Sequence, residues 1–389
     1  MFYGKYVFSQ VLEFVNKYEF DKCVERYFGN YHVRELNCWN QFVQLFFGQI
    51  TSLNSLQSIC LCLKAHKRQL YHLGIRRNVS VSTLSRANEK RDWRIFSDFG
   101  NHLINKIRPL YADCSIPNIG IENEIFALDS TSISVSINLL TWAKGNYSSR
   151  GAVKMHTLLD LRGSIPSFIL ITDGKYHDSN VLDMLTFSSN AIYLMDKAYV
   201  DFTALYCIQK AGAFFVTRAI FSLRYNVIEQ NFNIDKSTGI RADKTVMLTV
   251  YRSRKQYPEK LRLVEFYDSE KEVLLEFLTN NFEVSAFEIA CLYKNRWQIE
   301  VFFKWIKQNL VIKKLWGYSE NAVKIHLWIA IITYLIVAYI KHAVKSDYSI
   351  YEIMQILSVS TFDKTSLPEL LTEQRQFNQD VKEQLLLFV

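Results

Sequence analysis

The chain has 389 residues, enough for two or three domains with a sizeable core. Hydrophobic residues make up 49% of it and charged residues 22%, which excludes a mostly disordered chain, and the low counts of 13 Gly and 5 Pro exclude long flexible linkers and fibrous repeats. The formal net charge of +8 is compatible with a polyanionic partner such as nucleic acid, but does not require one.

Neither a disulfide framework nor a zinc site is expected. The seven cysteines are scattered without a CxxC pair, and we interpret them as reduced thiols of a cytoplasmic protein. The opening residues MFYGKYVFSQ do not resemble a signal peptide. The apolar run IHLWIAIITYLIVAYI at 325–340 has 16 residues, fewer than the roughly 20 that span a bilayer, so we predict a buried helix and no membrane contact.

The N-terminal part, residues 1–115, is predicted to be a helical DNA-binding domain. Residues 55–74 have a helical pattern that ends at Gly74, and a second helix follows with Ser82 as its N-cap. Two helices joined by a short turn that contains glycine predict a helix-turn-helix at about 56–94.

Basic residues concentrate in this same stretch. Between Lys64 and Arg94 there are nine Lys and Arg residues and two acids, a net charge of +7. Such a patch can neutralise several phosphates, and Arg86 and Lys90 are our candidates for DNA contacts. The alternative is a solvated helical face without a ligand.

From about residue 121 the pattern changes to strands alternating with helices, which is typical of an α/β domain. Two apolar strands end on an acid: IFAL precedes Asp129, and AIYLM precedes Asp196. Ligands of α/β sheets bind at such strand ends, although either acid alone would also serve as an N-cap or turn residue. Residues 220–275 predict extra strands inserted into this layout, and a long helix begins near Ser285.

A third acid lies within that long helix, in LYKNRWQIEVFFKWIKQNL. At about 100° per residue, one stripe roughly 80° wide carries Tyr293, Arg296, Glu300, Lys304 and Lys307. The side predicted to face the core carries Ile299, Phe302, Phe303 and Ile306. The stripe can offer a metal-binding carboxylate flanked by phosphate-binding cations; the alternative is an amphipathic helix with ordinary ion pairs between successive turns.

The spacing Tyr293-x2-Arg296-x3-Glu300-x6-Lys307 resembles the YREK signature of DDE transposases of the fourth insertion-sequence family. FALDSTSI resembles the segment that carries their first catalytic Asp, and LMDKAYVDF the segment that carries the second. The likeness covers most of the chain. It implies an α/β fold with a ribonuclease-H-like mixed sheet flanked by helices and a β-rich insertion, preceded by an all-α N-terminal DNA-binding domain.

This resemblance implies specific roles. The catalytic triad, which would also hold two Mg²⁺ ions with Mn²⁺ as a substitute, consists of Asp129, Asp196 and Glu300. The residues expected to contact DNA phosphates are Tyr293, Arg296 and Lys307, and we add Lys304 because it shares the helical stripe. His177, in KYHDS, is interpreted as a turn residue rather than a ligand.

The resemblance further implies a transposase that binds the ends of an insertion sequence and catalyses metal-dependent cleavage and strand transfer. Its partners would be double-stranded DNA, terminal inverted repeats and target DNA, with a homodimer in the synaptic complex near the bacterial nucleoid. The expected domains are 1–115, a catalytic domain at 121–345 and a helical region at 346–389. The alternatives are a nuclease of the same fold that never joins strands, and a transposase-derived DNA-binding regulator.

Overall fold

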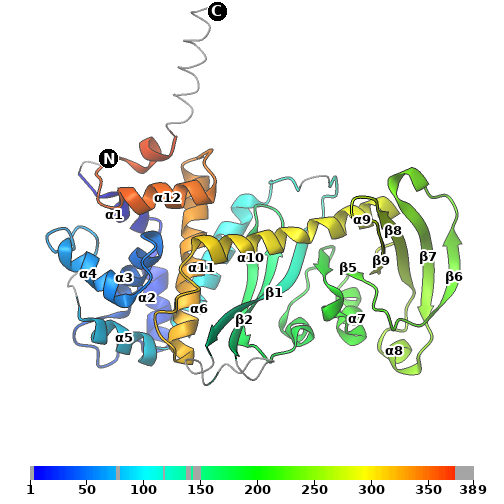
Figure 1. The fold of residues 1–389 in the computed structure, drawn as a ribbon, viewed down its shortest axis with the longest axis horizontal. Coiled ribbons are helices and arrows are strands. Elements are labelled where there is room, and N and C mark those ends of the chain that lie inside the picture. Colours follow the sequence, from blue (N-terminus) through cyan, green and yellow to red (C-terminus); the bar gives the residue numbers. More distant parts are fainter. Residues whose placement is uncertain (1–3, 76–78, 117–118, 137–141, 143–149, 373–389) are drawn as a thin grey trace, which may run out of the picture.

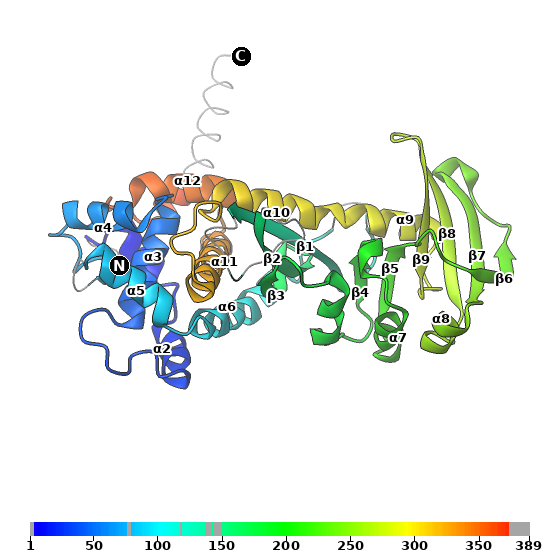
Figure 2. The same cartoon turned by 60° about the horizontal axis from the view of Figure 1, so that its bottom comes forward.

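The computed structural model describes residues 4–75, 79–116, 119–136, 142 and 150–372. Its first part is helical. The helices that precede the sheet are α1 (Val7–Leu12), α2 (Lys17–Arg26), α3 (Cys38–Ile50), α4 (Leu56–Ala65), α5 (Val81–Lys90) and α6 (Arg94–Ile107). They gather at one end of an elongated molecule (Figures 1 and 2).

Within the described residues, nine strands form one continuous sheet in the order β3-β2-β1-β4-β5-β9-β8-β7-β6. The strands are β1 (Ile125–Ser136), β2 (Arg150–Asp160), β3 (Ile165–Asp173), β4 (Ile192–Met195), β5 (Phe214–Arg218), β6 (Tyr225–Asn231), β7 (Ile240–Leu248), β8 (Leu261–Asp268) and β9 (Val273–Thr279). The pairs β1–β4 and β4–β5 are parallel, and the others are antiparallel. The first five strands have the ribonuclease-H-like arrangement, as predicted.

The strands predicted as an insertion extend this same sheet. Strand β9 pairs with β5 on one side and with β8 on the other, which joins β6–β9 to the ribonuclease-H-like part. The short helix α8 (Tyr251–Gln256) lies between β7 and β8 along the chain. Figure 1 shows these strands at the end of the molecule opposite the N-terminal helices.

Helices cover both faces of the sheet because successive residues of each strand point to opposite sides. In β1, Ile125 and Ala127 belong to one apolar core, and Phe126 and Leu128 belong to the other. The helix α7 (Phe202–Lys210) packs into the second core. On the first face lie α9 (Ala286–Asn295) and α10 (Trp297–Asn309), which run along the sheet in Figure 2.

The apolar segment predicted to be a buried helix is the central part of α11 (Glu320–Ala343). This helix has 24 residues and, by length and composition alone, could cross a membrane, so the argument from its length was wrong. However, 89% of its most apolar window is buried inside the protein, where it packs against α3, α5, α6 and α12 (Ile350–Ser360). The prediction of a buried helix is therefore confirmed.

The predicted helix-turn-helix is wrong in its boundaries. The first helix, α4, ends at Ala65 rather than Gly74, because the following turns allow Leu70, Leu73 and Ile75 to reach the core. The next helix has Ser80, not Ser82, as its N-cap. The connection at 66–80, of which 76–78 lie outside the described residues, is much longer than the turn of about 3–4 residues that defines the motif.

Among the described cations of the basic stretch, one is buried. The guanidinium of Arg91 is buried and donates to Gln41 Oε1 at 2.7 Å, and Arg94 pairs with Asp92. The described members that remain exposed are Lys64, Lys67, Arg68, Arg86, Lys90 and Arg94. Arg76 and Arg77 lie outside the described residues. No disulfide joins the seven cysteines, all of which lie in the described residues; Cys23, Cys38 and Cys60 are buried, whereas Cys114 and Cys207 are exposed.

Candidate active site

Two of the predicted acids lie side by side on the neighbouring central strands β1 and β4, where β4 ends; we call this place the acidic edge. Parallel pairing places Leu128 of β1 opposite Met195 of β4, so Asp129 and Asp196 are the next residues on neighbouring strands. Adjacent strands lie about 4.8 Å apart. Asp196 follows the last residue of β4, whereas Asp129 lies within β1, which continues to Ser136, so the predicted strand end at Asp129 is wrong. The local sequence therefore positions each acid, and the strand pairing brings them together.

The third acid reaches the same edge from a helix. Glu300 lies in the first turn of α10, which packs against β1. Between Glu300 and β1 lies the guanidinium of Arg296, whose Nη1 donates to Asp129 Oδ2 at 2.9 Å and whose Nη2 donates to Glu300 Oε1. One arginine thus bridges two carboxylates that are far apart along the chain.

The long helix predicted from Ser285 onwards is divided at this arginine. Helix α9 ends at Asn295 and α10 begins at Trp297, and the Arg296 amide bonds the Tyr293 carbonyl at 3.0 Å in a tight 3₁₀-type turn. The predicted core side is confirmed, since it is buried at Ile299, Phe302, Phe303 and Ile306. The opposite side still brings Tyr293, Arg296 and Glu300 to the acidic edge.

Tyr293 contacts the remaining acid. Its hydroxyl donates to Asp196 Oδ1 at 3.3 Å, and its ring packs against Phe277 with a centroid distance of 4.8 Å. Burial raises the pKa of Tyr293 to about 12, so its hydroxyl keeps its proton at neutral pH. All three acids are therefore contacted by side chains from the junction of α9 and α10.

The charges of the three acids act on one another. Burial raises the pKa of the Asp129 carboxyl, and the negative charges of Glu300 and Asp196 add to this rise. The Ser130 amide, which donates to Asp129 Oδ1 at 2.8 Å, and the positive charge of Arg296 oppose it. Burial is the largest of these influences on the pKa of Asp129.

The predicted DNA-contacting cations occupy different positions. On α10, Lys304 is exposed and Lys307 is half-buried, and neither forms an ion pair with a carboxylate of the described residues. Burial, together with the charge of Lys313, lowers the pKa of Lys307. Arg86 and Lys90 are exposed on α5, in the N-terminal helical part (Figure 1).

Sequence reasoning missed two polar residues near this edge. Arg218 ends β5, and because Thr217 pairs with Met195, it is the lateral neighbour of Asp196. Asp178 accepts hydrogen bonds from Ser130 Oγ at 2.9 Å and from Lys154 Nζ at 3.2 Å. The signal for Arg218 was the strand AFFVTR with a cation at its end; no local pattern revealed Asp178.

His177, interpreted as a turn residue, has that role: its Nδ1 accepts from the Ser179 amide at the start of a short 3₁₀ segment.

The oxygen donors of Asp129, Asp196 and Glu300 are of the type that a hard divalent cation prefers. Their present spacing does not suit such a cation, because no three His, Cys, Asp or Glu side chains of the described residues are close enough together to hold a metal ion.

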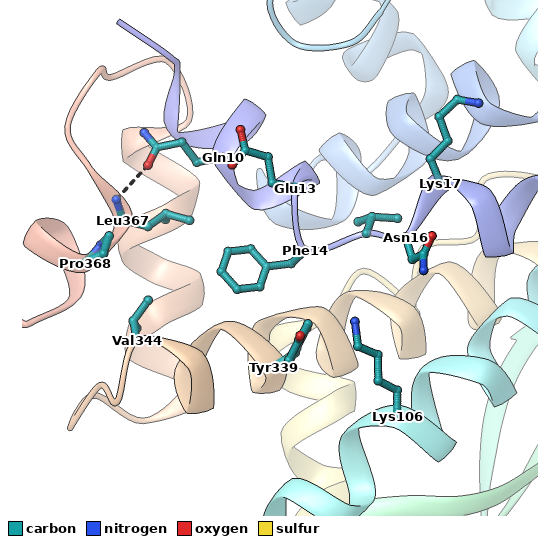
Figure 3. Close-up of a pocket in the computed structure, with 11 residues that line it drawn as sticks. Gln10, Glu13, Phe14, Asn16, Lys17, Lys106, Tyr339, Val344, Leu367 and Pro368 are labelled. Carbon is teal, nitrogen blue, oxygen red and sulfur yellow. Dashed lines mark hydrogen bonds between the residues drawn. The ribbon is translucent and has the colours of Figure 1, made fainter. Parts of the chain in front are cut away.

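A pocket of about 580 Å³ lies away from these acids, between α1, α6, α11 and the segment near Leu367 (Figure 3). Its wall is closed by a hydrogen bond from the Leu367 amide to Gln10 Oε1. Of its two lysines, Lys106 lies over the Tyr339 ring, 4.5 Å from the centroid, and Lys17 pairs with Asp21. None of the predicted site residues lines this pocket, and we assign it no catalytic role.

Comparison with known proteins relates the chain to transposases. It is 35% identical over 210 residues to the protein named as transposase y4zB of Sinorhizobium fredii, and 30% identical over 225 residues to one named as the transposase for insertion sequence element IS5377 of Geobacillus stearothermophilus. These matches cover 53% and 57% of this chain, and they span only 58% and 57% of the relatives' own lengths.

A third relative, named as the transposase for insertion sequence element IS4SA of Synechocystis, is 28% identical over 263 residues, or 66% of this chain and 71% of the relative. Among solved structures, a piggyBac transposase synaptic complex with hairpin DNA aligns with a TM-score of 0.47 and 10% identity, over 91% of this chain and 77% of the other.

Two families match the chain directly. Residues 3–76 match a domain family of unknown function, and residues 121–336 match the family described as the transposase DDE domain. The second match contains all three acids at the acidic edge and covers more than half of the chain. The chain therefore belongs to the transposase DDE domain family.

Proposed function

We propose that this protein binds the ends of an insertion sequence and catalyses metal-dependent DNA cleavage and strand transfer. One observation carries the proposal: Asp129, Asp196 and Glu300, from β1, β4 and α10, approach one another around Arg296 at the acidic edge. The names of the relatives support the same activity. We assign the chain to the YREK-bearing group from its helical signature.

Each residue has a proposed task. The three carboxylates would hold divalent ions, Mg²⁺ with Mn²⁺ as a substitute, and the bound ions would supply an activated nucleophile and stabilise the leaving oxygen. Tyr293, Arg296 and the unpaired Lys307 would bind phosphates beside the cleaved bond, with Lys304 further along the same helix. Because these residues would contact phosphates and not bases, other surfaces of the protein would recognise the sequence of the DNA end.

The exposed cations near α5 would bind DNA outside the acidic edge, and we place the domains for DNA binding and catalysis at 1–115 and 121–345. Bringing two ends together requires at least two copies, so we propose a homodimer in the DNA complex. The protein would cleave and join DNA in the cytoplasm. Inverted repeats at the ends and a target duplex are the proposed DNA partners.

A strand-transfer assay tests the proposed function. Pre-cleaved DNA ends are incubated with the protein, Mg²⁺ and a supercoiled target plasmid, and the products are analysed for joined ends. We expect joining, because the same acids that support hydrolysis can support attack by a 3′-hydroxyl. Cutting without joining would identify the protein as a nuclease and reject strand transfer.

Arg86→Ala and Lys90→Ala are each expected to weaken DNA binding and to reduce the slope of log affinity against log salt concentration by about 1, because each removes one phosphate contact. Filter binding at several salt concentrations measures the slope. Lys22→Ala is the control, since Lys22 is an exposed cation of α2 paired with Glu19. Wild-type slopes for both test variants would remove α5 from the DNA interface.

A further inference from the structure

We infer that Arg296 is an internal counter-ion of the acidic site, which keeps divalent metal out until a DNA phosphate draws its guanidinium away. This inference rests on the proposed function and adds its regulation: metal and DNA would be taken up together rather than independently. The same side chain that is expected to bind phosphate would guard the site before DNA arrives.

The contacts of Arg296 support a guarding role. Its two terminal nitrogens each donate to a different carboxylate, Asp129 and Glu300, and its side chain is only 14% exposed. Planar guanidinium groups hold two acceptors at once, which a lysine ammonium cannot do with the same fixed geometry. The guanidinium also lies over the Tyr293 ring, 5.7 Å from the centroid, and its buried Nε has no acceptor among the described residues.

The charge balance of the site gives the reason for this contact. Three carboxylates that act on one another electrostatically are costly to hold together without a compensating cation. In this structure the compensating charge belongs to the chain itself. A divalent ion placed between Asp129 and Glu300 would compete for the oxygens that Arg296 now occupies.

A DNA phosphate offers Arg296 an alternative partner. Arginine binds phosphate through two parallel hydrogen bonds, as it does carboxylate. Because the residue lies at the 3₁₀-type turn between α9 and α10, where hydrogen bonding is weaker than in a regular helix, its backbone can adjust. If phosphate removes Arg296 from the acids, DNA raises metal affinity, and by linkage metal raises DNA affinity by the same factor.

Binding of Mn²⁺ to the full-length protein without DNA tests the guarding contact directly. Arg296→Gln is expected to bind Mn²⁺ at least about tenfold more tightly than wild type, measured by electron paramagnetic resonance of free Mn²⁺. Lys294→Gln is the matched control: Lys294 is exposed on α9, two residues away, and it pairs with no carboxylate of the described residues. It is expected to bind Mn²⁺ like wild type, because exposed charges are screened.

The coupling with DNA is measured by repeating the titration with a pre-cleaved DNA end. Wild-type protein is expected to gain about tenfold in Mn²⁺ affinity on adding DNA, whereas Arg296→Gln gains much less, because its site is already open. Arg296→Lys, which keeps the charge but not the planar fork, is expected to fall between the two. This conservative variant also replaces Arg296→Gln if circular dichroism shows that the glutamine variant is unfolded.

The outcomes separate the inference from the function. Equal Mn²⁺ affinity of wild type and Arg296→Gln, or of wild type and Arg296→Lys where the glutamine variant is unfolded, would overturn the guarding role. Failure of all variants to bind Mn²⁺ would overturn both the guarding role and the metal-dependent function. Tighter binding by the variant, together with a wild-type protein that never cleaves DNA, would support the guarding role and reject the proposed cleavage.

Discussion

Asp129→Asn, Asp196→Asn and Glu300→Gln are each expected to slow DNA strand cleavage at least about a thousandfold, which corresponds to about 4 kcal/mol of lost transition-state stabilisation. Each change keeps the shape of the side chain but removes the negative charge that would bind a divalent ion. DNA-end binding is expected to change only a few-fold, since the exposed cations of α5 remain.

The measurement is a nicking assay on a labelled DNA end, run beside a gel-shift assay with the same duplex. Asp183→Asn is the control, because Asp183 is an exposed carboxylate in the 3₁₀ segment Asp178–Met184 of the same part of the protein. Cleavage at the wild-type rate by any of the three site variants would show that the corresponding acid is not needed, and the proposed site would be wrong.

Trp328→Ala is expected to lower the free energy of unfolding by about 3–5 kcal/mol. Trp328 is 1% exposed at the centre of α11, and it lies so close to α6 that a Cβ added at Gly100 would meet its ring at 2.6 Å. Removing the indole leaves a cavity between two helices that cannot approach each other further without moving their other contacts.

Loss of the Trp328 indole is expected to destabilise the whole protein, because α11 contacts both the N-terminal helices and the sheet. The Tyr334 hydroxyl of α11 donates to the Ser164 carbonyl between β2 and β3, and Tyr111 donates to the Ala338 carbonyl of α11. Urea unfolding followed by circular dichroism measures the loss. Val359→Ala, at a side chain that is 82% exposed on α12, is the control, and an equal effect of both substitutions would contradict this role of Trp328.

The residues of the acidic edge could be predicted to a large extent from local patterns. The apolar runs before Asp129 and Asp196 are recognisable because a strand buried on both faces must be a continuous apolar run. Asp196 does follow the end of β4, but the prediction that a strand ends at Asp129 was wrong, because β1 continues to Ser136 through its pairing with β2. Helical periodicity identified the side of α10 that faces the core at Ile299 and Phe303. Each of these signals depends on residues that are close in sequence.

Other features depended on long-range contacts. The first predicted helix of the basic stretch stops at Ala65, because burial of Leu70 and Leu73 outweighs the local helical pattern. The strands at 220–275 were expected as an insertion, but only the pairing of β9 with β5 shows that they continue the sheet. Arg91, counted with the surface charges, is buried against Gln41.

Amino-acid order alone therefore determined that apolar strand segments precede Asp129 and Asp196, and that Glu300 lies on a helix. The tertiary structure decided how their charges are paired: the guanidinium of Arg296 lies between Asp129 and Glu300. The physical reason is that periodicity and strand ends arise from neighbouring residues, whereas an ion pair between residues 167 positions apart forms only when the folded chain brings them together.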